Sequence, residues 1–411
     1  MTDPRCPVDD PVAARTAGAD WLSLALIDAR NHTLRWLAAI EAAPAGALGS
    51  AAGGPPALWW AGHAAWFADW WILRHVHAGR GEAGDPDRPR LASAWDGSDH
   101  FFHAERRAAA AQIELPPAAE VRSWMADTLE AVLDLLSGAG DSDDALCLYR
   151  QALRQEDRVG ETLAVIADGL DVVDAPWPVV PARADPGPLC LPGQTWQLGS
   201  VPGGMVPGPE RWAQAVPLPE FEIDGRAVSW ARYAEFVADG GYDAPQWWSP
   251  AGWAWAQRTQ RRAPRTVAEF GQGVVIQSRG RLLRVPAVQA AAHVSRHEAE
   301  AWCAWAGRRL PIEAEWEAAA IGAAARGFVG GEVLEWVAGR ARSLVDLRAA
   351  SSGTHPSVDP PGEFDRLPPA PAGMLRGACV FTPRRAAHPK ARRFAPLEED
   401  LLPTGFRSCA R

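Results

Sequence analysis

The segment from residue 293 to residue 320 constrains the fold most, because it joins two predicted helices through a fixed turn. It reads HVSRHEAEAWCAWAGRRLPIEAEWEAAA. Ser295 and Glu298 have capping-box spacing, so a helix is predicted to begin there. Gly307 is expected to end this helix, and Pro311 to open the next. Apolar residues recur in the first helix with the helical period, so it needs a partner surface within a larger domain.

Two further motifs follow in order. Residues 331–336 read GEVLEW, and residues 404–407 read TGFR. In this order the three motifs resemble the formylglycine-generating-enzyme-like (sulfatase-modifying-factor) domain, which carries R-L-P-T-E-A-E-W-E and G-N-V-W-E-W. The resemblance implies a mixed, turn-rich, C-type-lectin-like domain. True formylglycine-generating enzymes place two copper-binding cysteines near the C-terminus, whereas only Cys379 lies in that region here, so sulfatase activation is not expected.

The composition is that of a globular protein with more than one core. The chain has 411 residues, of which 47% are hydrophobic and 22% charged. It has no apolar run long enough for a membrane span, and its N-terminus is acidic and polar, so a cytoplasmic protein is expected. A net charge of −9 argues against nucleic acid as a partner. The six cysteines form no CxxC pair and are expected to be reduced and mostly buried.

The N-terminal part of the chain has the periodicity of helices. They are predicted at residues 18–43, 57–77, 117–137 and 144–168, and a four-helix bundle is their simplest packing. Residues 176–192 are rich in proline and cannot hold a regular element. The sequence therefore predicts an α+β protein: a helical bundle over 1–175, a linker over 176–192 and the mixed domain over 193–411.

Residues 55–67, PPALWWAGHAAWF, add a second resemblance. They resemble the P-L-x-W-x-x-x-H-x-A-W-F segment of the DinB-like bundle of ergothioneine-type sulfoxide synthases. A DinB-like bundle followed by a formylglycine-generating-enzyme-like domain is typical of that family, so the resemblance covers nearly the whole chain. Residues 22–37, LSLALIDARNHTLRWL, resemble the selenoneine synthase branch more narrowly.

This family implies a mononuclear non-haem iron(II) ion held by three histidines. One comes from the helix that contains His63, and two come from an H-E-x-x-H-x-E motif on the last bundle helix. That motif aligns with residues 154–163, where Gln155 and Val159 replace the histidines. Glutamine is a weak neutral ligand and valine is none. The candidate metal ligands are therefore His63 and Gln155, and Fe(II) is either held by a rebuilt ligand set or lost.

Other residues are candidates to complete such a set. They are Glu156 and the histidines of two nearby stretches, His75, His77, His100 and His103. We expect His63 to face the cleft between the domains, near Gln155 and Val159. The alternative for His63 is a histidine hydrogen-bonded in the bundle core.

Three residues are candidates for substrate binding. Arg106 falls where related proteins carry an H-D-T-R-W segment, and an arginine there can grip a carboxylate, although a solvated face is its default role. Trp95 precedes it in a loop, and Trp336 lies in the GEVLEW motif, where a structural role is also open. The 21 tryptophans could also supply an aromatic cage for the trimethylammonium group of hercynine.

Two functions remain open from the sequence. The first is an iron- and O2-dependent enzyme of the ergothioneine/selenoneine type, which would couple a thiol or selenosugar to hercynine. The second is a metal-free relative that keeps the two-domain shell and acts as a ligand-binding or partner protein. The lost histidines, and the absence of any tyrosine after Tyr242 where the family often has a catalytic one, favour the second.

Overall fold

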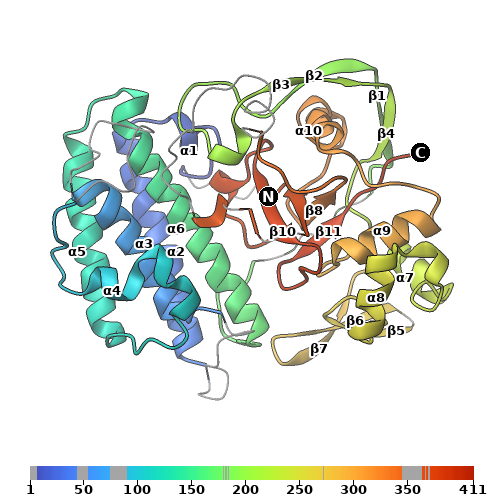
Figure 1. Cartoon of the computed structure of the whole chain (residues 1–411), viewed down its shortest axis with the longest axis horizontal. Helices are drawn as coiled ribbons and strands as arrows, with labels where there is room; N and C mark the ends of the chain where they lie inside the picture. Colours follow the sequence, from blue (N-terminus) through green and yellow to red (C-terminus); the bar gives the residue numbers. More distant parts are fainter. Residues whose placement is uncertain are drawn as a thin grey trace.

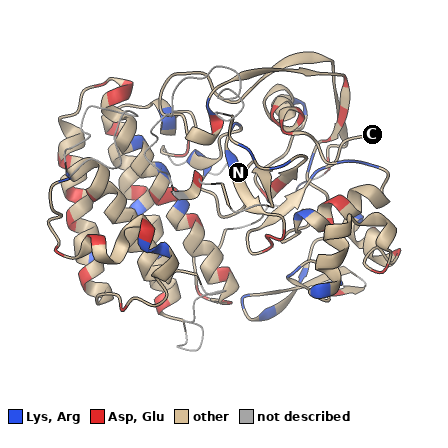
Figure 2. Ribbon diagram, in the orientation of Figure 1, with Lys and Arg blue, Asp and Glu red and all other residues tan. Residues whose placement is uncertain are grey.

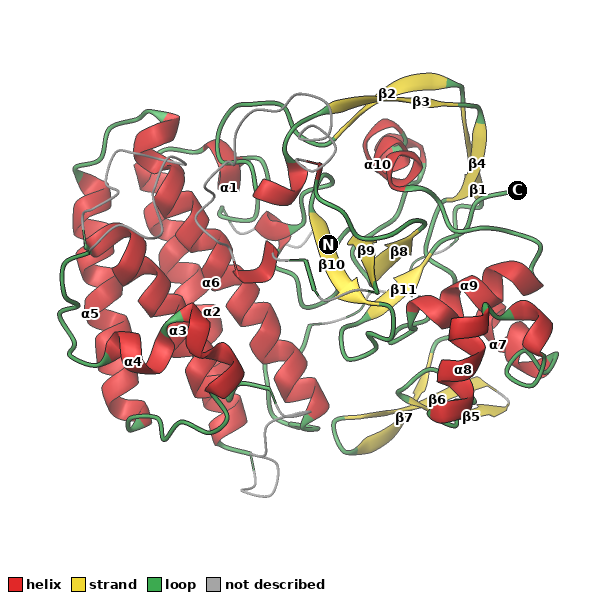
Figure 3. Ribbon diagram, viewed as in Figure 1, coloured by secondary structure: helices red, strands yellow, loops and turns green. Residues whose placement is uncertain are grey.

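The computed structural model describes residues 7–43, 54–74, 90–178, 180, 183, 185–271, 273–344, 363–365, 367–368 and 371–411. Long helices fill one side of the molecule, and short strands with shorter helices fill the other (Figure 1; Figure 3). None of the helices in these ranges is long and apolar enough to cross a membrane.

Four long helices form the N-terminal bundle, as predicted. They are α2 (Ala19–Glu41), α3 (Ala57–Ala68), α5 (Ala118–Ser137) and α6 (Asp143–Gly169). A π-helical turn, Asp69–Leu73, continues α3, while residues 75–77 of the predicted helix lie outside the described residues. Shorter elements surround the bundle: α1 (Ala13–Thr16), α4 (Ser98–Phe102) and a 3-10 helix (Ala104–Ala109).

Helix α6 is central to the bundle and packs against both α2 and α3. At the first turn of α6, the Ser142 hydroxyl accepts a hydrogen bond from the amide of Ala145. The negative charge of Asp143 interacts favourably with the helix dipole at the same end. Its apolar stripe includes Leu153, Val159 and Leu163, which lie in the bundle core. Several of its other buried positions are charged, and Asp157 and Glu161 among them contact the second domain.

The second domain contains four small sheets in the part of the chain that the structure describes. The largest has the strand order β10-β9-β8-β11, in which β8 and β11 are parallel. Its strands are β8 (Leu334–Val337), β9 (Ala372–Arg376), β10 (Arg392–Pro396) and β11 (Thr404–Phe406). The others pair β1 (Pro188–Leu191) with β4 (Phe221–Asp224), β2 (Gln194–Leu198) with β3 (Gln214–Leu218), and β5 (Val267–Gly271), β6 (Gly273–Ser278) and β7 (Arg281–Val285) together.

The helices of this domain pack around the sheets (Figure 1). They are α7 (Trp230–Ala238), α8 (Pro250–Arg258), α9 (Arg296–Trp305) and α10 (Glu313–Gly322). The predicted capping box of Ser295 and Glu298 opens α9, and Gly307 follows that helix with a φ of +67°. Helix α10 begins shortly after Pro311, at Glu313.

The three sequence motifs meet at one buried carboxylate. Glu335 of β8 accepts a hydrogen bond from the indole of Trp316 on α10 at 2.9 Å. Arg407 of the closing TGFR segment pairs with the same carboxylate, with Nη2 at 2.8 Å from Oε1. The Glu335 carboxylate is buried, and both of its oxygens accept hydrogen bonds. These motifs therefore stabilise the core of the domain rather than form a reactive site.

The cysteines in the described ranges are thiols rather than disulfides. Cys147, Cys303, Cys379 and Cys409 are buried, whereas Cys190 is exposed, which agrees with the prediction of reduced and mostly buried thiols.

Candidate functional site

His63 lies in the bundle core, with 1% of its surface exposed. Its ring is stacked between Trp59 and Trp66, with centroids 4.8 and 5.4 Å away. Its Nδ1 lies 2.8 Å from the carbonyl oxygen of Phe102, at the end of α4. Because a carbonyl can only accept, Nδ1 carries the hydrogen and fixes the ring. Trp60, rather than His63, is the α3 residue stacked on the second-domain residue Phe364, at 5.5 Å.

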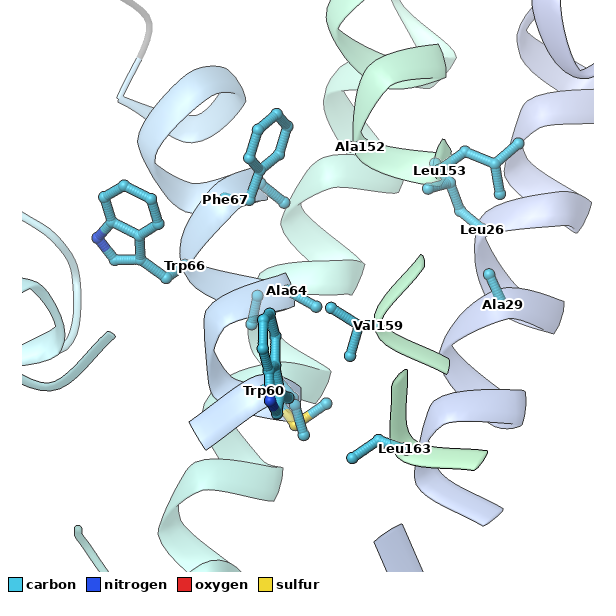
Figure 4. Packing of buried hydrophobic residues seen from close by; sticks show 14 of the residues in the cluster. Leu26, Ala29, Trp60, Ala64, Trp66, Phe67, Ala152, Leu153, Val159 and Leu163 are labelled. Atoms are coloured by element: carbon cyan, nitrogen blue, oxygen red, sulfur yellow. The ribbon is translucent and has the colours of Figure 1, made fainter. Parts of the chain in front are cut away.

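Gln155 and Val159 of α6 occupy the positions where the family has histidines. Val159 is fully buried, and Figure 4 shows its side chain pointing into the packing space shared with Ala64 and Trp60 of α3. Gln155 is 1% exposed, yet neither its amide oxygen nor its amide nitrogen has a hydrogen-bond partner among the described residues. A buried donor or acceptor without a hydrogen bond costs about 1–3 kcal/mol of folding free energy per group. The oxygen therefore keeps its lone pairs available, while Val159 closes the neighbouring position with hydrocarbon.

Among the remaining candidate ligands that the structure describes, Glu156 and His103 are engaged by other partners. Glu156 is occupied by a bidentate ion pair with Arg30, with both N–O distances 3.0 Å. His103 packs edge-on against Trp66 at 4.8 Å, and its Nδ1 accepts from the amide of Glu105. His75 and His77 lie outside the described residues. Across the ranges that the structure describes, three or more His, Cys, Asp or Glu side chains nowhere come together as a metal site. Within these ranges, the side chains around His63, Gln155 and Val159 do not fit a three-histidine iron centre.

The structure places the three predicted substrate residues in different surroundings. Arg106 is exposed on the 3-10 helix. Trp95 is half-buried and packs on Trp124 of α5 at 4.9 Å. Trp336 is 0% exposed, and its indole donates to the carbonyl of Val294 at 2.9 Å, in the core of the second domain. The assignment of these three residues to a substrate stays a prediction, and none of them lines either of the two cavities described below.

Ion pairs join α6 to the second domain. Asp157 pairs with Arg385 at 2.8 Å, and Glu161 pairs with Arg393 at 2.7 Å. Charged positions of both signs follow the boundary between the two halves in Figure 2. Burial alone would raise the pKa of Glu161, but the guanidiniums of Arg393 and Arg158 lower it to about 2. Glu161 is therefore ionised at every physiological pH and holds the two domains together electrostatically.

The first cavity, the arginine cavity, lies along this charged boundary. Its empty volume is ≈580 Å³ including its opening to solvent, and among the described residues seven arginines but only two carboxylates line it. The lining arginines include Arg154 and Arg158 of α6, Arg385 and Arg393 of the second domain, and Arg15 of α1. Guanidinium groups therefore dominate the lining of this cavity within an acidic protein, although each is paired with a carboxylate.

The second cavity, the aromatic cavity, lies at the C-terminal end of α6. Its empty volume is ≈790 Å³ including its opening to solvent, and its lining includes Trp230, Phe381, Asp168, Glu332, His293 and Arg279. Asp168 lies 3.8 Å from Nε2 of His293, whereas Glu332 is engaged bidentately by Arg226 at 2.8 Å. Burial raises the pKa of Asp168, and His293 opposes that rise.

Arg279 brings a positive charge to this second cavity. Its guanidinium lies 4.3 Å from the centroid of the Trp177 ring. Its Nε is buried without a hydrogen-bond partner from the described residues, and burial lowers the pKa of the group. The aromatic cavity is thus lined by aromatic side chains, carboxylates and a guanidinium whose Nε has no hydrogen-bond partner among the described residues.

Sequence comparison accounts for much of this architecture. Residues 181–374 match the model of the sulfatase-modifying factor enzyme 1-like domain. A hercynine oxygenase of Mycolicibacterium smegmatis is 31% identical over 277 residues, which are 64% of this chain and 60% of that protein. The chain belongs to the ergothioneine-synthase-type family with a formylglycine-generating-enzyme-like domain.

Other relatives agree with this family. A hercynine oxygenase of Mycolicibacterium thermoresistibile is 30% identical over 309 residues, covering 72% of this chain and 65% of that protein. A formylglycine-generating enzyme of Streptomyces coelicolor is 33% identical over 186 residues, covering 42% of this chain and 59% of that enzyme. This ergothioneine-synthase-type chain thus spans about three fifths of the length of its hercynine oxygenase relatives.

Sequence reasoning missed the charged boundary. Arg154, Asp157, Arg158 and Glu161 recur on α6 at helical spacing, and this repetition was the available signal. A repeated charge pattern on one helix face normally marks a solvated face, whereas here the second domain covers it.

Proposed function

We propose that this chain recognises a hercynine-like betaine in the aromatic cavity, without a three-histidine iron centre. The observation that carries the proposal is the presence of aromatic side chains, a carboxylate and a guanidinium with an unpartnered Nε in the lining of one cavity. A trimethylammonium group has no N–H to donate, so aromatic faces and negative charge must hold it. Trp230, Phe381 and Asp168 supply these, and Arg279 supplies a donor for the ligand carboxylate.

Asp168 is better suited than Glu332 to balance the ligand cation. Glu332 already has two 2.8 Å contacts with Arg226, so its charge is largely neutralised. Asp168 pairs with His293 at 3.8 Å, and Nδ1 of this histidine donates to the carbonyl of Asp400 at 3.0 Å. His293 is therefore oriented with its other nitrogen towards Asp168, and a cationic ligand would take over the interaction with this carboxylate.

Calorimetric titration with hercynine and with histidine tests the proposal. Hercynine is expected to bind roughly 2- to 30-fold more tightly, because histidine lacks the quaternary ammonium group. Arg279→Gln is expected to weaken hercynine binding by about tenfold through loss of a charge-assisted hydrogen bond. Arg281→Gln, an exposed change on the adjacent strand β7, is the matched control. Equal affinity for the two ligands, or equal effects of the two variants, would remove the proposal.

A second candidate is an oxidative enzyme that acts on hercynine, forming a C–S or C–Se bond with a thiol or selenosugar. The similarity of this chain to hercynine oxygenases supports this candidate. The hydrogen bond from His63 to a backbone carbonyl also supports it, because metal-ligating histidines are commonly oriented in this way. The bare amide of Gln155 is the other supporting observation. The ligand set of Fe(II) on His63 and Gln155 would be incomplete with these residues alone, so this candidate requires a further ligand from outside the bundle core.

The proposed organisation follows the same family. We assign residues 1–175 to a DinB-like bundle, 176–192 to a linker and 193–411 to the formylglycine-generating-enzyme-like domain. The helices up to Gly169 and the strands from Pro188 onward support this division. Limited proteolysis tests it: cleavage within 176–192 that releases two stable fragments is expected, and preferential cleavage elsewhere would contradict it.

A further inference from the structure

We propose that the arginine cavity binds the oxyanion group of a small molecule, either a phosphate or a carboxylate. This site is distinct from the aromatic cavity: Arg154 and Arg158 of α6 and Arg385 and Arg393 of the second domain line it, and none of them lines the other. Both halves of the molecule supply its charge, so a bound anion would bridge them.

The positive charge is least compensated at Arg158 and Arg393. Both guanidiniums contact the same carboxylate oxygen, Oε2 of Glu161, at 3.3 Å and 2.7 Å. One carboxylate therefore serves two cations. Nε of Arg158 has no hydrogen-bond partner among the described residues, although the side chain is only 14% exposed. Burial and the neighbouring Arg393 lower the pKa of Arg158 to about 9. This lowering is consistent with too little negative charge around the two guanidiniums.

The other arginines of the cavity are each paired with a carboxylate, and Asp157 and Glu210 among these carboxylates also line the cavity. Arg385 pairs with Asp157 and Asp28, both within 2.8 Å. Arg15 pairs bidentately with Glu210 at 2.7 and 2.8 Å, and Arg154 pairs with Asp365. These pairs fix the guanidiniums in place and leave Arg158 and Arg393 as the centre of uncompensated charge.

The histidine of the lining does not add charge. Burial and Arg15 lower the pKa of His388 to about 4, so it is neutral at pH 7. Its Nδ1 accepts a hydrogen bond from the amide of Lys390 at 3.1 Å. The cavity therefore attracts an anion through arginine alone, and planar guanidinium forks match the geometry of phosphate and carboxylate oxygens.

Binding of inorganic phosphate, pyrophosphate and citrate to the full chain tests this inference, by calorimetry at low ionic strength. Saturable binding with one site is expected, and the comparison of phosphates with citrate distinguishes the two sources of oxyanion. Arg158→Gln is expected to weaken binding by about tenfold or more, because it removes a charged fork. Arg158→Lys, which keeps the charge, is expected to lose less.

Arg258→Gln is the control, because Arg258 is an exposed arginine that also pairs with a glutamate, at 2.7 Å. It removes the same charge from the protein but lies outside the cavity. Absence of saturable binding of all three anions to the wild-type chain would overturn the inference. Equal weakening by Arg158→Gln and Arg258→Gln would also overturn it, since binding would then follow net charge alone. Arg158→Lys keeps the comparison available if the glutamine variant does not fold.

Discussion

Replacing Glu161 by glutamine should weaken the interaction between the two halves of the molecule and lower the free energy of unfolding. Glu161 is 3% exposed and meets Arg393 at 2.7 Å, Arg158 at 3.3 Å and the hydroxyl of Thr382 at 2.5 Å. A carboxyl pKa lowered from 4.5 to about 2 corresponds to roughly 3 kcal/mol of favourable interaction with the ionised form. Breaking a buried ion pair by removing one partner costs about 3–5 kcal/mol, so the two figures agree near 3 kcal/mol.

Urea unfolding at pH 7, followed by tryptophan fluorescence, measures this loss. With a slope of about 3 kcal/mol per molar, the first transition of Glu161→Gln should move down by about 1 M. Glu130→Gln, an exposed change on α5, is the control and should stay within about 0.5 kcal/mol of the wild type.

A second substitution distinguishes the ion pair from a packing effect. Adding Arg393→Met to Glu161→Gln removes one of the stranded cations, so the double variant should lose less stability than the sum of the two single variants. A Glu161→Gln variant that loses less than about 1 kcal/mol, or a strictly additive double variant, would refute this role of the carboxylate.

Two further predictions concern buried polar groups. Gln155→Met should leave the stability unchanged or raise it by about 1 kcal/mol in the same urea assay, because the amide has no hydrogen-bond partner among the described residues; a clear loss would mean that the amide has a partner in solution. The folded-state pKa of His388 is lowered from 6.5 to about 4, so the folded protein binds fewer protons and loses stability as the pH falls from 6.5 towards 4. For this histidine the loss of unfolding free energy between pH 8 and pH 5 should be about 2 kcal/mol. His388→Gln should remove that part of the pH dependence. If the stability of this variant depends on pH as the wild type does, the dependence belongs to other groups.

The sequence predicted the elements well where local signals were sufficient. Capping boxes, turn glycines and helical periodicity are local, so α2, α5, α6 and α9 were predicted close to their observed ends. The resemblance likewise predicted the mixed second domain, and the structure adds that Trp316, Glu335 and Arg407 of its motifs meet in the core.

The candidate sites could not be predicted to the same extent. The pair of Glu161 with Arg393 joins residues on different domains, and nothing local in either segment signals the partner. His63 was expected to face the cleft between the domains, whereas it is buried in the bundle core with Trp59, Trp66 and Phe102 around it. Its closeness to Gln155 and Val159 stays a prediction. Side-chain direction on a tightly packed helix depends on all its neighbours, so the alignment of a motif did not determine it.

The metal content of the protein tests most directly whether this chain has an iron centre. The protein should be purified without oxygen, incubated with Fe(II), desalted and compared by elemental analysis with His63→Ala. The combined variant Gln155→His and Val159→His serves as a positive control, because it restores imidazoles at i and i+4 on one face of α6. We expect equal trace iron in the wild type and in His63→Ala, and more in the control. Iron near one equivalent in the wild type that disappears with His63→Ala would contradict the absence of an iron centre.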